Sequence, residues 1–138
     1  ENITIGVDNY DEKFLLKVSE VSGVMSWLGR TPNGFDYKLS EGGKELSGGQ
    51  RQTIAIARAL IRKPHYIILD EPTANMDTAT EQLVLKNLAE YFKDETVLIV
   101  THRMAPLSLV SRIVVLDNGK VNVDGPKEKI LERLKGAA

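Results

Sequence analysis

The chain has 138 residues, 42% of them hydrophobic, which is enough for one modest core and too few for two ordinary domains. Its 18 basic and 19 acidic residues give a net charge of −1, so the charge provides no reason to expect nucleic-acid binding or a polybasic membrane contact. The absence of cysteine excludes disulfide bonds and cysteine-ligated zinc sites. The chain begins Glu1-Asn2-Ile3, which is neither an initiator methionine nor a signal peptide, so we expect a piece of a longer protein.

Helical periodicity marks the first third of the chain. Hydrophobic residues at Phe14, Leu15, Val18 and Val21 predict a helix over about residues 11–24. A shorter apolar segment follows at residues 25–28. Glycine, proline and polar residues dominate residues 29–45, which predicts a loop with little regular structure.

A second helix is predicted directly after Leu46. Ser47 can cap it, and it should run to about Arg62, before Pro64. The residues expected on its buried face are Ile54, Ala57 and Ile61.

Three apolar runs predict strands, at residues 66–69, 96–100 and 113–116. Because the first two runs lack polar alternation, we expect them to be buried on both faces of a parallel sheet. Thr78-Ala79-Thr80-Glu81 has the spacing of a capping box and predicts a helix between these strands, with its inward positions at Leu85, Leu88 and Phe92.

The end of the chain predicts a hairpin and a last helix. Asp117-Asn118-Gly119 is typical of a tight turn into a strand at residues 120–123, and Pro126 stands at the start of a helix to about Leu134. Strands alternating with helices favour an α/β fold. In such sheets ligands gather at the carboxyl ends of the strands, where Asp70-Glu71 and Thr101-His102 follow two of the predicted strands.

Three short segments could carry chemistry. The backbone amides of Ser47-Gly48-Gly49-Gln50 could hold a phosphate oxygen at a helix start, although an ordinary serine cap explains them equally. One of the carboxylates of Asp70 and Glu71 could hold Mg²⁺ through water while the other activates an attacking water. Alternatively, the two residues could form only a polar end to the strand. His102 could contact a phosphate or be a plain residue at a strand end, and with His65 as the only other histidine a metal site is not expected.

The order of these segments resembles the ATP-binding domain of the ABC transporter family. The matching segments are Leu-Ser-Gly-Gly-Gln-Arg-Gln (46–52), Ala-Arg-Ala-Leu (57–60), Ile-Ile-Leu-Asp-Glu-Pro-Thr (67–73), Asp77 and Thr101-His102-Arg103. They correspond to the signature motif, Walker B, the D-loop and the H-loop. The resemblance implies an incomplete ABC-type P-loop NTPase core of parallel strands and helices, with residues 1–62 as a helical signature subdomain and residues 63–138 as the C-terminal part of the catalytic core.

The resemblance also implies a role for each matching residue. Ser47, Gly48, Gly49 and Gln50 would bind a nucleotide held by the opposite subunit, and Asp77 would organise the interface between subunits. Asp70 would act on Mg²⁺ through water, Glu71 would be the general base, and His102 would contact the γ-phosphate. ATP and Mg²⁺ are the implied cofactors, and a second ATP-binding domain and a transmembrane domain are the implied partners, at the cytoplasmic face of the inner (plasma) membrane.

The chain lacks the phosphate-binding loop Gly-x-x-x-x-Gly-Lys-Ser/Thr. Neither Gly43-Lys44 nor Gly119-Lys120 has the required neighbours. The isolated chain is therefore expected to be inactive. In the family, the strand that precedes the phosphate-binding loop lies between the strands predicted here at 96–100 and 113–116. Without that strand, we expect both neighbouring strands to have exposed edges and the chain to self-associate.

Residues 107–127 are similar to type I secretion exporters of toxins or adhesins, although Ser111 and Asn75 depart from that pattern. An alternative is the C-terminal lobe of a chromosome-maintenance or DNA-repair ATPase, where the phosphate-binding loop lies far away in the sequence. Residues 1–46 show no sustained heptads of the kind that precede such lobes. A third interpretation is a non-catalytic interaction module.

Overall fold

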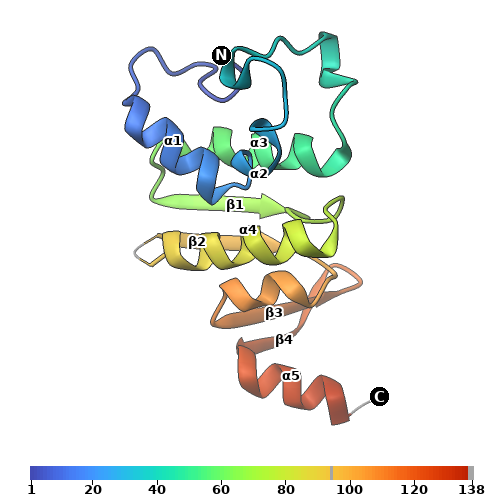
Figure 1. The fold of residues 1–138 in the computed structure, drawn as a ribbon. Helices are drawn as coiled ribbons and strands as arrows, with labels where there is room; N and C mark the ends of the chain where they lie inside the picture. Colours follow the sequence, from blue (N-terminus) through green and yellow to red (C-terminus); the bar gives the residue numbers. More distant parts are fainter. Residues whose placement is uncertain (94, 137–138) are drawn as a thin grey trace.

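A computed structural model describes residues 1–93 and 95–136. Helices and strands follow one another down the molecule in the order of the sequence (Figure 1). The helices are α1 (Glu12–Val21), α2 (Met25–Leu28), α3 (Gly48–Leu60), α4 (Thr78–Tyr91) and α5 (Lys127–Gly136), with 3-10 turns η1 (Gly34–Asp36), η2 (Glu41–Gly43) and η3 (Ala105–Leu109). The strands are β1 (Tyr66–Asp70), β2 (Thr96–Val100), β3 (Arg112–Asp117) and β4 (Lys120–Pro126).

The core lies among α1, α3, α4 and one side of β1. Its completely buried hydrophobic side chains come from all three helices and include Val18, Ala57, Leu60, Val84 and Leu88. Gly23 ends the first helical segment with a φ of +84°, and a Cβ there would lie 2.7 Å from a methyl group of Val84. The helix predicted over residues 11–24 is thus confirmed for most of its length, but ends at Val21 because Gly23 turns the chain against α4.

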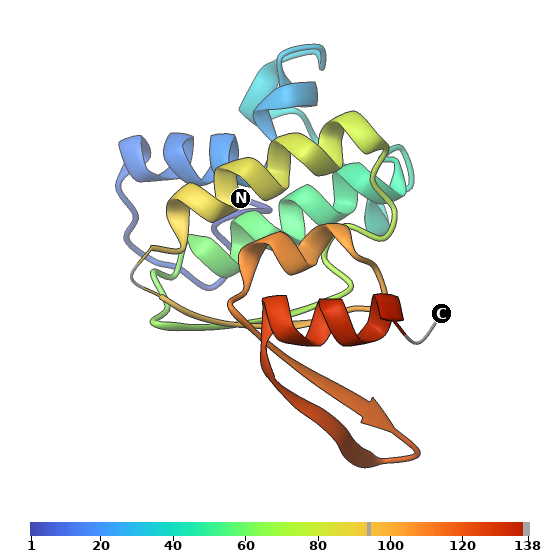
Figure 2. The same cartoon turned by 90° about the horizontal axis from the view of Figure 1, so that it is seen from below.

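Strands β1 and β2 form a parallel pair joined by α4, with Tyr66 opposite Thr96 and Asp70 opposite Val100. Helices α1, α3 and α4 gather on one face of this pair (Figure 2). Ile67 and Leu69 point into the core and are 3% and 8% exposed. The alternation of strands and helices confirms the predicted α/β fold class.

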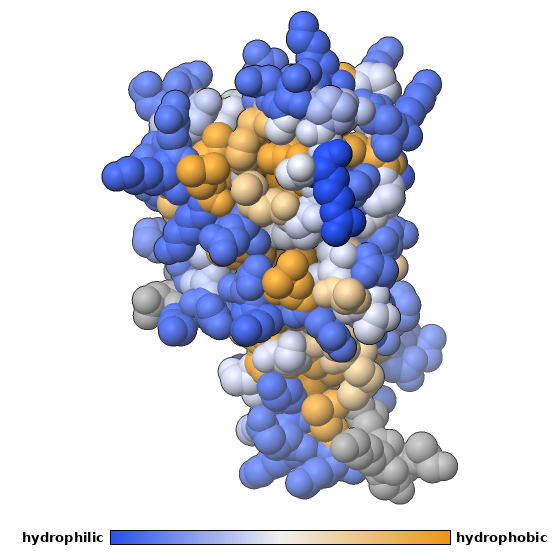
Figure 3. Space-filling model, in the orientation of Figure 1, coloured by the Kyte–Doolittle hydropathy of each residue, from blue (hydrophilic) through white to orange (hydrophobic). Residues whose placement is uncertain are grey.

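The prediction that these strands are buried on both faces is wrong. On the face away from the helices, Tyr66, Ile68, Leu98 and Val100 are 78%, 71%, 56% and 53% exposed. We call these four residues the bare face of β1 and β2. The local sequence predicted burial because both faces are apolar, but no described element covers the second one. The helical side, by contrast, shows hydrophobic groups in separate patches among many hydrophilic side chains (Figure 3).

Strands β3 and β4 form a separate antiparallel sheet, and neither pairs with β2 in the described residues. Asn118 and Gly119 both have positive φ values, 47° and 73°, as a tight hairpin turn requires. The predicted hairpin is therefore confirmed. It projects away from the helices (Figure 2), and Val114, Leu116 and Val121 on it are at least half exposed.

Helix α5 packs back on this hairpin through Ile130, which is 3% exposed and would lie 3.5 Å from a Cβ placed at Gly125. Within the described residues, no helix has both the length and the hydropathy that a bilayer span requires. The division of the chain at residues 62 and 63 stays a prediction.

Candidate functional site

Polar side chains from two loops meet where β1 and β2 end. The Thr101 hydroxyl donates to Glu71 Oε2 at 3.0 Å, and the His102 amide donates to Glu71 Oε1 at 2.9 Å. His102 Nδ1 lies 2.7 Å from the same Oε1. The structure thus brings together three of the four residues that the sequence placed at the strand ends, Glu71, Thr101 and His102.

These contacts set the charge of Glu71. Its partial removal from water raises its pKa, but the hydrogen bonds from the His102 amide, the Thr101 hydroxyl and the His102 ring hold that pKa below its ordinary value. The Glu71 carboxylate is therefore ionised at neutral pH and can only accept hydrogen bonds. It follows that His102 Nδ1 carries a hydrogen and donates a hydrogen bond to Glu71 Oε1.

The backbone at Glu71 is unusual, with a φ of +42° in a residue that has a side chain. Such a conformation costs of the order of 1–3 kcal/mol and persists only where the surroundings hold it. The Glu71 amide donates to the carbonyl of Val100 at 2.9 Å, which anchors this turn to the end of β2. This conformation directs the carboxylate toward the loop that carries Thr101 and His102.

Asp70 ends β1 with an exposed side chain, opposite Val100 in the ladder. The described residues contain no group of three or more histidine, cysteine, aspartate or glutamate side chains that could hold a metal ion. The neighbouring carboxylates of Asp70 and Glu71 fit Mg²⁺, which proteins bind through one or two carboxylates, with waters and substrate phosphates completing the shell. Two carboxylates do not fit a metal that is held by protein ligands alone.

The segment that contains Ser47 forms a capping box at the start of α3. Ser47 Oγ accepts from the Gln50 amide at 3.1 Å, and Gln50 Oε1 accepts from the Ser47 amide at 2.8 Å. The predicted serine cap is confirmed. Gly48 and Gly49 fit closely against the loop after β1, since a Cβ at either would lie 2.9 Å from an atom of Asn75. We call residues 47–50 the signature turn.

Asp77, and not the predicted Thr78, caps α4. Its carboxylate accepts from the Thr80 amide at 3.0 Å and the Thr80 hydroxyl at 2.7 Å, and these two bonds lower its pKa. The predicted capping box over residues 78–81 is therefore wrong. Glu81, which was assigned to it, points into the protein instead and is 6% exposed.

Glu81 belongs to a polar cluster that the sequence analysis missed. The Thr73 hydroxyl donates to Glu81 Oε1 at 2.6 Å, and Arg103 Nη2 donates to Glu81 Oε2 at 2.9 Å. Arg103 Nη1 also donates to the Thr73 carbonyl at 2.7 Å. The cluster ties the loops after β1 and β2 to α4, and the only sequence signal for it was an arginine next to His102.

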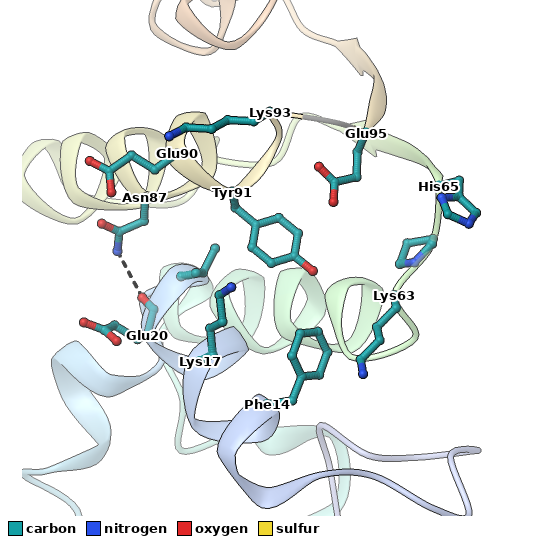
Figure 4. Close-up of a pocket in the computed structure, with 12 residues that line it drawn as sticks. Phe14, Lys17, Glu20, Lys63, His65, Asn87, Glu90, Tyr91, Lys93 and Glu95 are labelled. Carbon is teal, nitrogen blue, oxygen red and sulfur yellow. Dashed lines mark hydrogen bonds between the residues drawn. The ribbon is translucent and has the colours of Figure 1, made fainter.

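The depression shown in Figure 4 lies elsewhere, near the start of β1 and between α1 and α4. Lys17, Lys63 and Lys93 line it together with Glu20, Glu90 and Glu95, so its charges nearly balance. The candidate site is therefore the cluster of Glu71, Thr101 and His102 at the opposite end of β1.

Residues 3–74, just over half of the chain, match the family described as "ABC transporter". The chain belongs to this family. The match includes the signature turn, Asp70 and Glu71. The resemblance inferred from the order of the motifs is thus confirmed for an ABC transporter ATP-binding domain.

Relatives within the ABC transporter family include proteins with different cargoes. The chain is 39% identical over 131 residues to an ATP-dependent lipid A-core flippase of Desulfotalea psychrophila, covering 95% of this chain and 23% of that protein. It is 33% identical over 133 residues to the alpha-hemolysin translocation ATP-binding protein HlyB of Escherichia coli O157:H7, covering 96% of this chain and 19% of that protein. The chain therefore spans less than a quarter of the length of either relative.

A solved structure shares the whole fold. It is a bacterial Atm1-family ABC exporter with ATP bound, with a TM-score of 0.88 and 29% sequence identity. The similarity covers 99% of this chain and 26% of that one. Both sheets and the helices between them therefore occur together in an ABC exporter.

Proposed function

We propose that this chain is the C-terminal part of the ATP-hydrolysing domain of an ABC exporter. The observation that carries the proposal is the cluster at the ends of β1 and β2, where Glu71 accepts hydrogen bonds from Thr101 and His102. Phosphoryl transfer depends mainly on positioning and on charge stabilisation, and a cluster of this kind provides both.

Each residue of the cluster has a separate proposed role. Glu71 is ionised, so it can accept a proton from an attacking water. His102 uses Nδ1 to bind Glu71, which leaves Nε2 for the γ-phosphate, and a second proton on the ring is needed for Nε2 to donate. Asp70 would hold Mg²⁺ through water. When bound, the metal would neutralise charge on the phosphates of ATP.

The signature turn is proposed to serve a nucleotide held by a second ATP-binding domain. Its capping box occupies the amides of Ser47 and Gln50, so the amides of Gly48 and Gly49, at the positive end of the α3 dipole, remain for a phosphate oxygen. Asp77 is proposed to lie at the same interface, where its exposed carboxylate also caps α4.

The transmembrane domain is the second proposed partner, at the cytoplasmic face of the inner membrane. A groove between the N-terminal segment and residues 34–39 is lined by aromatic and aliphatic side chains, including Tyr10, Trp27, Phe35 and Tyr37. Its lining includes Leu39, two residues before η2 in the sequence, and Glu41-Gly42-Gly43 of η2 is similar to the exporter segment that meets the membrane domain. Such a groove suits an amphipathic helix.

The finer proposal concerns the cargo. The similarity of residues 107–127 to type I secretion exporters favours a protein or peptide as the cargo. The relatives include HlyB and a lipid A-core flippase, so they support an exporter without singling out one class of cargo. They are transporters, which favours the exporter over the chromosome-maintenance alternative.

The proposed function is tested by the ATPase activity of a transporter that contains this chain. We expect Mg²⁺-dependent hydrolysis that is lost when His102 or Glu71 is replaced. Hydrolysis that is unchanged by both replacements would contradict the assignment of the cluster as the catalytic site.

The isolated chain of 138 residues is expected neither to hydrolyse ATP nor to bind it with micromolar affinity. Its sequence lacks the phosphate-binding loop, whose amides and lysine provide most phosphate contacts in this class. Titration calorimetry with Mg-ATP is the measurement. A clear micromolar isotherm with about one site per chain would overturn this expectation.

The isolated chain is also expected to self-associate through the bare face and the open edge of β2. Side chains of Tyr66, Ile68, Leu98 and Val100 are exposed, and apolar burial yields roughly 25 cal/mol per Å². Unpaired strand edges add a template for pairing with a second copy. Light scattering coupled to size exclusion, over a range of concentrations, should show a dimer or larger assembly. The double variant Ile68→Lys, Leu98→Lys should shift it toward monomer, whereas a wild-type monomer at high micromolar concentration would refute the expectation.

A further inference from the structure

One side chain of α3 joins the signature turn to the loop that carries Glu71. Gln52 lies one turn after the start of the helix and is partly buried. Its Nε2 donates to the carbonyl of Glu71 at 3.0 Å, and its Oε1 accepts from the amide of Asn75 at 3.0 Å. The orientation of the side-chain amide is unambiguous, because a backbone carbonyl can only accept and a backbone amide can only donate.

The first of these bonds acts on the unusual backbone at Glu71. This residue has a φ of +42°, and its amide is held by the carbonyl of Val100 at 2.9 Å. Gln52 holds the carbonyl of the same residue from the helical side. The strained residue is thus fixed between β2 and α3, and its carboxylate reaches Thr101 and His102 from that position.

The second bond acts on the segment that contacts the signature turn. Gly48 and Gly49 approach Asn75 so closely that a Cβ at either would lie 2.9 Å from it. The amide of Asn75 is bound by Gln52 of the same helix. A displacement of the start of α3 must therefore move the loop of residues 71–75, and the reverse also holds.

We propose that Gln52 is a positioning residue that couples the signature turn to Glu71. The inference rests on the proposed function, in which the signature turn serves the nucleotide of the opposite subunit and Glu71 serves the nucleotide of its own. Under that assignment Gln52 links two ATP sites through a single side chain. Its effect on hydrolysis comes through the placement of Glu71.

Two substitutions separate the two hydrogen bonds. Gln52→Glu keeps an acceptor for the Asn75 amide but cannot donate to the Glu71 carbonyl. Gln52→Leu has a similar size and loses both bonds. Gln82→Glu and Gln82→Leu, at an exposed position of α4, are the matched controls.

The first readout is amide hydrogen exchange and amide chemical shifts in the chain itself. We expect both Gln52 variants to raise the exchange rate of the His102 amide, which donates to Glu71, by about tenfold, the effect of losing one hydrogen bond. Amides in the middle of β1 and β2 should keep their rates, which excludes a general loss of stability. Only Gln52→Leu should shift the amides of Gly48, Gly49 and Asn75 strongly.

The second readout is ATP hydrolysis by a transporter that contains the chain. Both Gln52 variants should lower kcat by about tenfold or more with little change in ATP affinity, because a misplaced base affects the chemical step and not binding. The Gln82 variants should behave like the wild type in both assays.

The outcomes of the two assays are distinct. Wild-type exchange at His102 together with wild-type kcat in both Gln52 variants would overturn the coupling, even if Glu71→Gln abolishes hydrolysis. Hydrolysis that survives Glu71→Gln would instead refute the proposed function, while the exchange data would still decide whether Gln52 positions Glu71. If Gln52→Leu does not fold, Gln52→Glu alone decides the bond to Glu71.

Discussion

Replacing Glu71 by glutamine is expected to lower ATP hydrolysis by about 10²–10⁴-fold in a transporter that contains this chain, because a general base contributes about that much to the rate. The amide keeps the size of the side chain, and its oxygen can take the place of Oε1 and accept from the His102 amide, while its nitrogen can donate to the Thr101 hydroxyl. It cannot accept a proton from water. ATP binding should therefore be retained while turnover is lost.

The measurement is steady-state hydrolysis together with nucleotide binding in the same preparation. Glu90→Gln is the matched control, since Glu90 is an exposed glutamate on α4 far along the helix from the site. Residual turnover of Glu71→Gln within a few-fold of the wild type would show that Glu71 is not the base.

Glu81→Ala is expected to lower the free energy of unfolding of the chain by about 3 kcal/mol, at the lower end of the range for breaking a buried ion pair. Glu81 is 6% exposed and binds both Thr73 and Arg103, so its removal leaves two donors without their acceptor. The value lies at the lower end because the side chain of Arg103 is 32% exposed and water can reach it.

Urea denaturation provides the test, and a surface pair in the same chain provides the control. Arg112 and Asp124 lie 2.6 Å apart, but their side chains are 71% and 37% exposed. Asp124→Ala should therefore cost much less than Glu81→Ala despite the short distance, because water screens this pair. Equal losses of unfolding free energy for Glu81→Ala and Asp124→Ala would mean that burial does not set the strength of the Glu81 cluster.

The double variant Glu81→Leu, Arg103→Met should lose less unfolding free energy than the sum of its two single changes, because neither charge is left buried without its partner.

Most of the helices and strands could be predicted from the sequence, because each has a strong local pattern. Ser47 caps α3 and the apolar side chains of residues 54–61 form its buried face, and both features can be read from the local sequence. The turn at Asn118-Gly119 likewise determines the β3–β4 hairpin. Candidate residues at strand ends could be named because the carboxyl ends of parallel strands meet at one edge.

The errors came from features that depend on distant partners. The apolar runs of β1 and β2 do not reveal that one face is left uncovered by the part of the chain that the structure describes. The spacing from Thr78 to Glu81 fits a capping box, but Arg103, more than twenty residues away, draws Glu81 inward while Asp77 takes the capping position. Gln52 belongs to the matching segment 46–52, but nothing in the sequence indicated its role, which exists only where α3 contacts the loop after β1.

The division of the strands into two separate sheets has a consequence for how the chain folds. The β3–β4 hairpin pairs residues that are close in sequence, and hairpins of this kind form in about 1–10 μs. The parallel pairing of β1 with β2 must first close a loop that includes all of α4, so it gains its contacts later and more slowly. Because no ladder joins β2 to β3 in the described residues, the early hairpin cannot template the parallel pair. The assembly of the site at Glu71 and His102, which needs β1 and β2 side by side, is then a late event in folding.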